Sequence, residues 1–433
     1  MPSQRPSLST DEAVRFIEGC CFPEAGNEGN DGPGTLRCGV EIEWLTTPLG
    51  DPRSHLPAEE ALRVVETVGD LPGCSKVTLE PGGQVELSSA PGSPADVCRL
   101  MAVDARVARR RLAGAGVGMV GVGLDPVRPP RRVLQYPRYA AMEQFFDHHG
   151  PAGRTMMCST AAIQVNLSLG SGEEQEARWR QANLIGPTMT AAFANSPFLH
   201  GEPSGWRSSR AAVWRMLDLS RTSPVPLVGD AANAWARYAL NAQVMLVRDA
   251  SGAFLPDLEH LTFGAWMAKG HAAGFPTVDD LRYHLTTLFP PVRPRGWLEL
   301  RFVDTLGEPW WPVPLLVAAA IVCDQEAAET ARSACQPAST LWVEAARHGL
   351  GHPVLAKAAQ GCFTAAIDAL DRIGADPAGR EAVGSFMERF VANGRCPADD
   401  LLDAWAVSGE LYPEDRGQPP DTLDLMEPAW TIS

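Results

Sequence analysis

The stretch GVEIEWL (residues 39–45) places two acids, Glu41 and Glu43, in an otherwise apolar run. Side chains two positions apart in a β-strand point to the same face, so the two carboxylates share one face and the apolar side chains share the other. Two carboxylates ~4 Å apart repel each other by ~4 kcal/mol at an effective dielectric of about 20. Water, arginines, a shared proton or a metal ion must offset this repulsion. Alone, the heptapeptide is equally compatible with a solvent-facing edge strand that carries two ordinary acids.

Strand and helix patterns alternate along the rest of the chain. Predicted strands lie at about 36–46, 76–80, 84–89, 116–124, 159–168, 237–249 and 296–306. Predicted helices lie at 10–19, 94–114 and 173–194, and the pattern is helical from Pro312 to about Val407. Strands scattered among helices, several of them joined by tight turns, favour an α+β fold with a mainly antiparallel sheet and helices on the outside.

The chain has 433 residues, which is enough for one large enzyme or for two domains. Its composition changes near residue 311, but no linker separates the two parts. We therefore expect a single catalytic unit. Within it, residues 36–312 would form the sheet-containing active-site core, residues 313–410 a helical subregion and residues 411–433 an irregular tail.

Composition excludes several function classes. The formal net charge of −15 argues against a nucleic-acid partner, because that affinity depends on cationic side chains. The only lysines are Lys76, Lys269 and Lys357, and no GxxxxGK[ST] motif occurs, which excludes a Walker-type phosphate loop. The longest apolar run, residues 311–323, contains two prolines and is too short to cross a bilayer. The first residues lack a secretory pattern, so we expect a cytoplasmic protein with no membrane partner.

Ten cysteines are spread along the chain, and no pair of them has CxxC spacing. Without an export signal, such cysteines are typical of reduced thiols that are mostly buried as small apolar side chains. We expect no structural zinc.

The stretch TLEPGGQVELSS (residues 78–89) predicts a β-hairpin, because Pro-Gly-Gly is turn chemistry between two short strand patterns. Glu80 lies on one arm and Glu86 on the other, so the hairpin can bring their carboxylates together.

Two later predicted strands also place polar side chains together on one face. In TAAIQVNLSLG, Gln164 and Asn166 alternate with apolar residues, and in WLELRF, Glu299 and Arg301 share one face. Carboxylate and amide oxygens are hard ligands of the kind that magnesium takes, whereas zinc or iron would call for histidine or cysteine. The alternative is a polar sheet face held together by salt bridges. The candidate ligand set is Glu41, Glu43, Glu80, Glu86, Gln164 and Glu299.

Residues 195–222 concentrate positive charge in an acidic chain. This segment carries four arginines, and two tryptophans lie among them. The planar guanidinium group of arginine can donate two parallel hydrogen bonds to carboxylate or phosphate oxygens. The segment therefore indicates a pocket for a small anion. The alternative is a basic surface helix. The four arginines are Arg207, Arg210, Arg215 and Arg221.

Seven motifs, taken in chain order, resemble those of glutamate–cysteine ligases, most closely the plant-type and actinobacterial branch. That branch includes the bacterial ligase that opens ergothioneine biosynthesis. The resemblance runs from about residue 36 to 312, and the last third of the chain carries no motif of the family. The motifs are GVEIEWL, TLEPGGQVELSSAP, GVGLDP, PRYAAMEQFF, MMCSTAAIQVNLS, SGWRSSRAAVW with SRT, and WLELRFVD.

The resemblance implies a fold of the glutamine-synthetase superfamily, in which a curved antiparallel sheet forms a cup that holds magnesium and ATP. It implies that ATP, glutamate and cysteine give γ-glutamylcysteine, ADP and phosphate. The γ-carboxylate of glutamate would attack the γ-phosphate of ATP, and the cysteine amine would then displace phosphate from the γ-glutamyl phosphate.

The resemblance also assigns roles by position. It implies that the six oxygen ligands named above hold magnesium, and that Arg210 and Trp214 grip the glutamate substrate. Met156 or Met157 would line the same pocket, and Arg301 would meet the transferred phosphate as the catalytic arginine. From the strand and arginine patterns, we add three further candidate substrate-binding residues, Asn166, Arg207 and Arg221.

Other functions stay open at this point. A related carboxylate–amine ligase could use another amine, and a homologue that binds nucleotide or amino acid could lack turnover. A magnesium phosphohydrolase would need similar acids but no amino-acid pocket. The residues that bind the cysteine side chain are not identifiable from the sequence.

Overall fold

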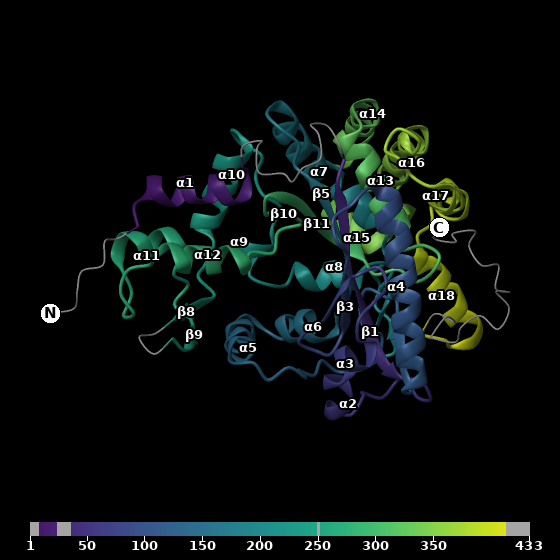
Figure 1. Cartoon of the computed structure of the whole chain (residues 1–433), viewed down its shortest axis with the longest axis horizontal. Coiled ribbons are helices and arrows are strands. Elements are labelled where there is room, and N and C mark those ends of the chain that lie inside the picture. Colours follow the sequence, from purple (N-terminus) through teal and green to yellow (C-terminus); the bar gives the residue numbers. More distant parts are fainter. Residues whose placement is uncertain (1–7, 24–35, 249–251, 413–433) are drawn as a thin grey trace.

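A seven-stranded antiparallel sheet lies at the centre of the protein (Figure 1), as seen in a computed structural model that describes residues 8–23, 36–248 and 252–412. The strand order is β10-β11-β5-β1-β3-β2, and β4 pairs with the far end of β1. The predicted α+β class with an antiparallel sheet is confirmed. The strands are β1 (Cys38–Pro48), β2 (Lys76–Leu79), β3 (Val85–Ser88), β4 (Val117–Val120), β5 (Ala162–Ser168), β10 (Val292–Pro294) and β11 (Trp297–Asp304).

Strand β1, which carries the GVEIEWL stretch, is the middle strand of the sheet. Its first part pairs with β5 on one side and β3 on the other, and its last residues pair with β4. Val40, Ile42 and Trp44 are buried on the apolar face. The solvent-facing edge strand is therefore excluded, and the two acids of the stretch project from the centre of the sheet.

Three helices cover the apolar face. Ser93 caps the first of them, α4 (Pro94–Gly114), by accepting a hydrogen bond from the backbone N–H of Asp96, and Pro94 fits the first helical position. Helix α7 (Glu173–Ala192) packs on β11, and α13 (Pro312–Cys323) packs on β1 and β5. Residues 313–322 of α13 are all buried, because this helix lies between the sheet and the helices that follow it.

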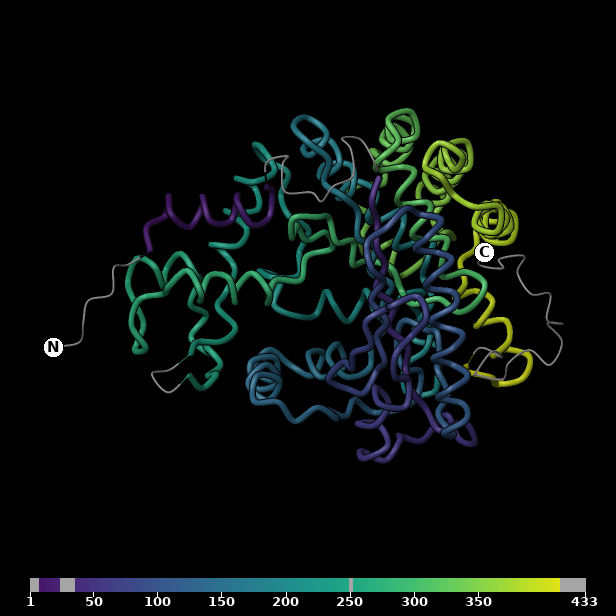
Figure 2. Tube along the Cα trace, in the orientation of Figure 1, coloured from purple at the N-terminus to yellow at the C-terminus, as the bar shows by residue number. Residues whose placement is uncertain are grey.

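The chain after β11 folds into helices that lie along one side of the sheet, green to yellow in Figure 2. They join the core through an aromatic cluster in which Phe386 contacts Phe193, Phe363 and Trp310. The further α-helices are α14 (Gln325–Cys335), α15 (Trp342–His348), α16 (Pro353–Ala369), α17 (Pro377–Arg389) and α18 (Pro397–Ser408). Short 3₁₀ helices lie at Gln336–Ala338, Gly349–Gly351 and Val391–Asn393.

The opposite side of the sheet is occupied by short helices and hairpins, on the left of Figure 1. They are α1 (Thr10–Cys21), α9 (Leu219–Thr222), α10 (Ala231–Asn241), β8 (Leu246–Arg248), β9 (Phe254–Pro256), α11 (Phe263–Lys269) and α12 (Val278–Thr286). The remaining elements are α2 (Ala58–Leu62), α3 (Val64–Val68), α5 (Pro137–His149), α6 (Ala152–Ser159), β6 (Phe198–Leu199), β7 (Glu202–Pro203) and α8 (Ser209–Trp214).

The predicted strand at 237–249 is wrong over its first half. Asp230 caps α10 by accepting from the backbone N–H of Asn233, and the helix runs on to Asn241 because Trp235 and Tyr238 stack on its buried face. Of the described residues in this stretch, only Leu246–Arg248 is a strand. The alternating run of side chains therefore belongs to a helix end followed by a short hairpin arm.

Most of the predicted tail, residues 413–433, lies outside the described residues. Among the residues that the structure describes, no helix combines the length and the apolar character that crossing a bilayer requires. All ten cysteines are free thiols.

Candidate active site

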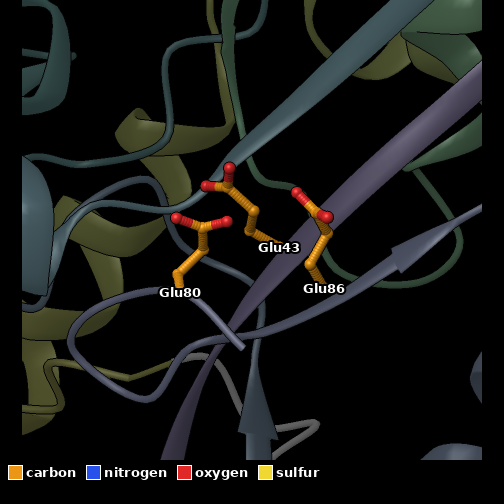
Figure 3. Close-up of side chains that lie close together, drawn as sticks. All are labelled: Glu43, Glu80 and Glu86. Atoms are coloured by element: carbon orange, nitrogen blue, oxygen red, sulfur yellow. The ribbon is translucent and has the colours of Figure 1, made fainter. Parts of the chain in front are cut away.

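Three carboxylates converge on the polar side of the sheet: Glu43 from β1, Glu80 from the turn after β2, and Glu86 from β3 (Figure 3). One oxygen of each lies within 4.8 Å of the others. Glu43 and Glu86 are directly opposite in the β1–β3 register. We call these three residues the carboxylate cluster. The strand register and the hairpin turn bring them together from two separate parts of the sequence.

The hairpin turn that places Glu80 is tightly held. The N–H of Glu80 donates to the carbonyl of Gln84 at 2.9 Å, and the N–H of Gly83 donates back to the carbonyl of Glu80 at 2.9 Å. Gly83 has a φ of +91°, a conformation that favours glycine. A Cβ at Gly82 would lie 2.2 Å from the carbonyl oxygen of Cys158, so only glycine lets the turn pack on the end of α6.

The carboxylate cluster is electrostatically unfavourable on its own. Burial, and then the charge of Glu86, raises the pKa of Glu43 to about 7. Burial, and then the charges of Glu43 and Glu86, hold the pKa of Glu80 well above its usual range. Glu86 is better supported, because one of its oxygens accepts from the hydroxyls of Thr78 at 2.7 Å and Ser88 at 3.2 Å. Near neutral pH such a set binds either protons or a cation.

Glu299 has a different environment from the carboxylate cluster. Its two oxygens accept from Arg293 at 2.6 and 3.0 Å, from Arg295 at 3.0 Å and from Arg301 at 3.0 Å. Burial alone would raise the pKa of Glu299, but Arg293 and Arg301 outweigh it and hold this pKa far below its usual range. Three guanidinium groups therefore surround Glu299, and the structure does not bring it to the carboxylate cluster.

The other predicted ligands are engaged in hydrogen bonds beside the carboxylate cluster. The amide of Gln164 donates to Glu43 at 3.2 Å, and its oxygen accepts from Arg301. Glu41 accepts from the amide of Asn166 at 3.0 Å. The sheet thus brings together three of the six predicted ligands and holds the remaining three in a polar network next to them.

A cavity of about 240 Å³ opens from the carboxylate cluster. Glu43 and Glu80 line this cavity, and so do Arg210, Trp214 and Arg301. Met156 and Met157, from α6, also line it. The remaining lining includes Pro81, Gln84, Arg138, Tyr139, Met142, Thr160, Ala162, Tyr283, Thr286, Thr287 and Phe289.

Arg210 is buried, with 3% of its surface exposed, and it is incompletely paired. One terminal nitrogen donates to the backbone carbonyl of Arg301 at 2.8 Å, and the other lies 3.7 Å from a carboxylate oxygen of Asp304. Its Nε has no hydrogen-bond partner among the described residues. The guanidinium lies 5.8 Å from the ring centre of Trp214. A buried cation with an unused donor beside an aromatic wall is suited to an anionic ligand.

Arg301 lies in an irregularity of β11, because the register against β5 shifts between Leu300 and Val303. Such bulges redirect side chains and are common beside active sites. Here the bulge accompanies a guanidinium that reaches Glu299 and Gln164 and also lines the cavity. Its Nε has no partner among the described residues.

Two of the predicted substrate-binding arginines are held elsewhere. Arg207 donates to Asp399 of α18 at 2.6 Å, so it fastens the C-terminal helices. Arg221 is fully buried, where it pairs with Asp218 at 3.0 Å and donates to backbone carbonyls. Neither lines the cavity, because each has found an internal partner. Asn166 contacts Glu41 and Trp297 and is likewise outside the cavity lining.

Helix α5 contributes residues to the cavity that were not predicted from the sequence. Tyr139 and Met142, three residues apart on this helix, line the cavity together with Arg138. Their helical spacing inside the motif PRYAAMEQFF could have indicated a shared face. Asp304 was also missed, because the bulge in β11 breaks the alternation that would have placed it.

The chain is similar to proteins of known family. The model of the family "Glutamate-cysteine ligase family 2 (GCS2)" matches residues 37–418. The chain is 43% identical over 392 residues to glutamate–cysteine ligase EgtA of Mycolicibacterium smegmatis, which covers 88% of this chain and 90% of that protein. It is 42% identical over 412 residues to EgtA of Mycobacterium tuberculosis, with the same coverage. A chloroplastic glutamate–cysteine ligase of Medicago truncatula is 30% identical over 286 residues, covering 64% of this chain and 55% of that one.

A solved structure with a similar fold is that of glutamate–cysteine ligase from Francisella tularensis in complex with AMP. The TM-score is 0.51 at 12% identity, and the match covers 87% of this chain and 86% of that one. This likeness concerns the fold alone. Given the match of the family model over most of its length, the chain belongs to glutamate–cysteine ligase family 2.

Proposed function

We propose that the protein is an ATP-dependent ligase that joins the γ-carboxylate of glutamate to the amine of cysteine through a γ-glutamyl phosphate. The observation that carries this proposal is one cavity whose wall contains two acids of the carboxylate cluster and an incompletely paired, buried arginine. The acids suit a cation bound to a polyphosphate, and the arginine suits the carboxylates of an amino acid. Family membership supports the same reaction.

The carboxylate cluster fits magnesium on chemical grounds. Its donors are hard oxygens. Burial first, and then repulsion from the neighbouring acids, raises the pKa values of Glu43 and Glu80, and a bound divalent cation would offset both. We propose that Glu43, Glu80 and Glu86 hold magnesium, which when bound would neutralise charge on the phosphates of ATP. We also propose Glu41 and Gln164 as ligands of further ions. Glu299 would join them once its contacts with the guanidinium groups are released.

The other residues bind and orient the substrates. Arg210 would receive a carboxylate of glutamate on its unpaired Nε edge, with Trp214 and the two methionines of α6 enclosing the carbon chain. Arg301, which already neutralises Glu299, would stabilise the negative charge of the transferring phosphoryl group. Positioning of the two reactants side by side in a confined cavity would supply much of the rate enhancement.

Three finer points belong to the same proposal. The sheet would curve into a cup around the substrates, as the family resemblance implies. The product would enter ergothioneine biosynthesis, in keeping with the EgtA relatives. A cytoplasmic location, where ATP, glutamate and cysteine are all available, remains a prediction.

The release of ADP tests the proposed reaction. With ATP and magnesium present, we expect fast ADP release when glutamate and cysteine are both supplied and little release with either amino acid alone. The control is release of γ-glutamylcysteine in equal amount, measured in the same samples. Fast ADP release without any amino acid would instead indicate a phosphohydrolase, and release with glutamate and an amine other than cysteine would indicate a different ligase.

The choice of amine acceptor is a further prediction. Cysteine should be preferred over 2-aminobutyrate, and 2-aminobutyrate over serine. The thiol takes no part in the chemistry, and a pocket that suits a weakly hydrated sulfur also accepts a methyl group of similar polarity. A hydroxyl without a dedicated partner there costs ~1–3 kcal/mol to desolvate, so we expect kcat/KM for serine to be lower by about tenfold to a hundredfold. Similar values for alanine, serine and cysteine would contradict the proposed acceptor.

A further inference from the structure

Three histidines that the proposed reaction does not use lie together at the end of α5. His148 and His149 are its last residues, and His260 comes from the segment after β9. The ring centres are 5.6 Å apart for His148 and His149, 5.8 Å for His148 and His260, and 5.5 Å for His149 and His260. We call these residues the histidine triad. The two segments are more than a hundred positions apart in sequence, so only the fold brings them together.

Two of the three rings are oriented as metal ligands usually are. Nδ1 of His149 lies 3.0 Å from the carbonyl of Phe145, which can only accept, so this nitrogen carries the proton. Nδ1 of His260 lies 3.0 Å from Oε1 of Gln243, which also accepts. In both rings the lone pair is therefore left on Nε2. Metal-binding histidines are fixed in this way, by donation from the other ring nitrogen to a carbonyl or carboxylate.

The free ring nitrogen of His149 has no other use in the fold. Its Nε2 is buried and has no hydrogen-bond partner among the described residues. A buried polar atom without a partner costs free energy, and a metal ion would satisfy it. The ring packs instead against the rings of His148 and His260.

The spacing of the rings agrees with a shared ion. A Zn–N bond of about 2.0–2.1 Å puts a ring centre ~3.2 Å from the metal, so two tetrahedral ligands have ring centres ~5.2 Å apart. The observed separations are 5.5–5.8 Å. Among the described residues, only the carboxylate cluster already has all its ligand atoms within 4.8 Å, so the histidine triad needs side-chain rotation to close. His148 and His260 are both exposed, which leaves room for such a rotation.

One feature of the backbone favours a cation at this place, and a second one positions His260. The triad lies at the C-terminus of α5, where the helix dipole is negative. His260 has a φ of +58°, a left-handed conformation that is uncommon for a residue other than glycine and costs energy. The N–H of Leu261 donates to Asp257 at 3.0 Å and helps to hold this turn. The strained conformation directs His260 toward the end of the helix.

We propose that His148, His149 and His260 bind a transition-metal ion of the zinc class through their Nε2 atoms. Imidazole nitrogens suit zinc, cobalt, nickel and copper and do not suit magnesium, so the site would be chemically distinct from the carboxylate cluster. The ion would fasten the end of α5 to the segment after β9. Since Arg138, Tyr139 and Met142 of the same helix line the cavity, the ion would stabilise one wall of the active site from outside.

Cobalt titration tests the proposal on the full-length, reduced protein, without a histidine tag and in excess magnesium to occupy the acids. We expect one Co²⁺ per chain, with the visible absorption of nitrogen-bound tetrahedral cobalt and without the near-ultraviolet band of a thiolate ligand. His149→Gln and His260→Asn should each weaken binding by at least about tenfold. Asparagine is chosen at 260 because it tolerates the left-handed backbone.

The matched control is His200→Asn. His200 is also exposed and also has a left-handed φ, of +55°, but it lies outside the histidine triad. We expect this variant to bind cobalt as the wild type does. We expect zinc to raise the melting temperature of the wild type and of His200→Asn, but not that of His260→Asn. No bound cobalt at micromolar concentration, a thiolate band, or equal binding by the two asparagine variants would overturn the proposal.

Discussion

Replacing Glu86 by glutamine is expected to lower kcat of the ligase reaction by about a hundredfold or more, because it removes one negative charge from the set of acids that would hold magnesium. The fold should tolerate the change. The oxygen that accepts from Thr78 and Ser88 is retained in glutamine, and the new amide lies beside acids that can accept from it. Because one of three repelling charges is lost, the free energy of unfolding without magnesium should stay the same or rise.

Both quantities are needed to interpret this variant. A steady-state assay at saturating ATP and magnesium gives kcat, and thermal unfolding in a chelator gives the stability. Glu202→Gln is the control, since Glu202 is an exposed glutamate on β7. Loss of activity together with a lower melting temperature would indicate a structural role for Glu86, and near wild-type turnover at limiting magnesium would remove it from the metal site.

Arg210→Lys should raise KM for glutamate by about tenfold to a hundredfold and change KM for ATP by less than about twofold. Lysine keeps the charge but loses the fork that can hold a carboxylate while also donating to the backbone carbonyl of Arg301. The two Michaelis constants, measured at saturating levels of the other substrates, separate the possible roles. A defect confined to ATP would assign Arg210 to the phosphate end of the cavity.

Arg207→Lys provides the comparison from the same short segment. The arginine pattern alone indicates equivalent roles for Arg207 and Arg210, whereas the structure pairs Arg207 with Asp399. We expect its KM for glutamate to match the wild-type value within about twofold. Its melting temperature should fall slightly, because a partly buried ion pair is weakened. A raised KM for glutamate in Arg207→Lys would return this residue to the substrate pocket.

The sheet was predictable from the sequence because local rules determine it. Alternation in GVEIEWL gave the apolar and acidic faces of β1, and Pro81-Gly82-Gly83 gave the turn that brings Glu80 toward Glu86. Helix α4 was predicted with its observed bounds, Pro94–Gly114, because apolar residues recur at helical spacing and a glycine ends the run. The residues Arg210, Trp214, Met156 and Met157 were predicted through motifs, and all four line the cavity.

The contacts of Glu299 were missed although they are local. Arg293 stands opposite it in the β10–β11 hairpin, and Arg295 lies four positions before it. The other residues that the sequence did not place depend on pairings between distant segments. Arg207 and Arg221 are separated from Arg210 only by partners that the fold supplies. The histidine triad is invisible for the same reason, since its members come from two segments that sequence order keeps apart.

The burial of α13 has a consequence for how the protein is made. Strands β1, β3, β4 and β5 are all complete by Ser168, but the helix that covers β1 and β5 ends only at Cys323. A ribosome adding about 5–20 residues per second needs on the order of 10 s to supply the roughly 150 residues between them. For that interval, part of the apolar face of the sheet lacks its cover, and it is open to contact with other nascent chains. We expect the newborn chain to depend on chaperones until α13 has left the ribosome.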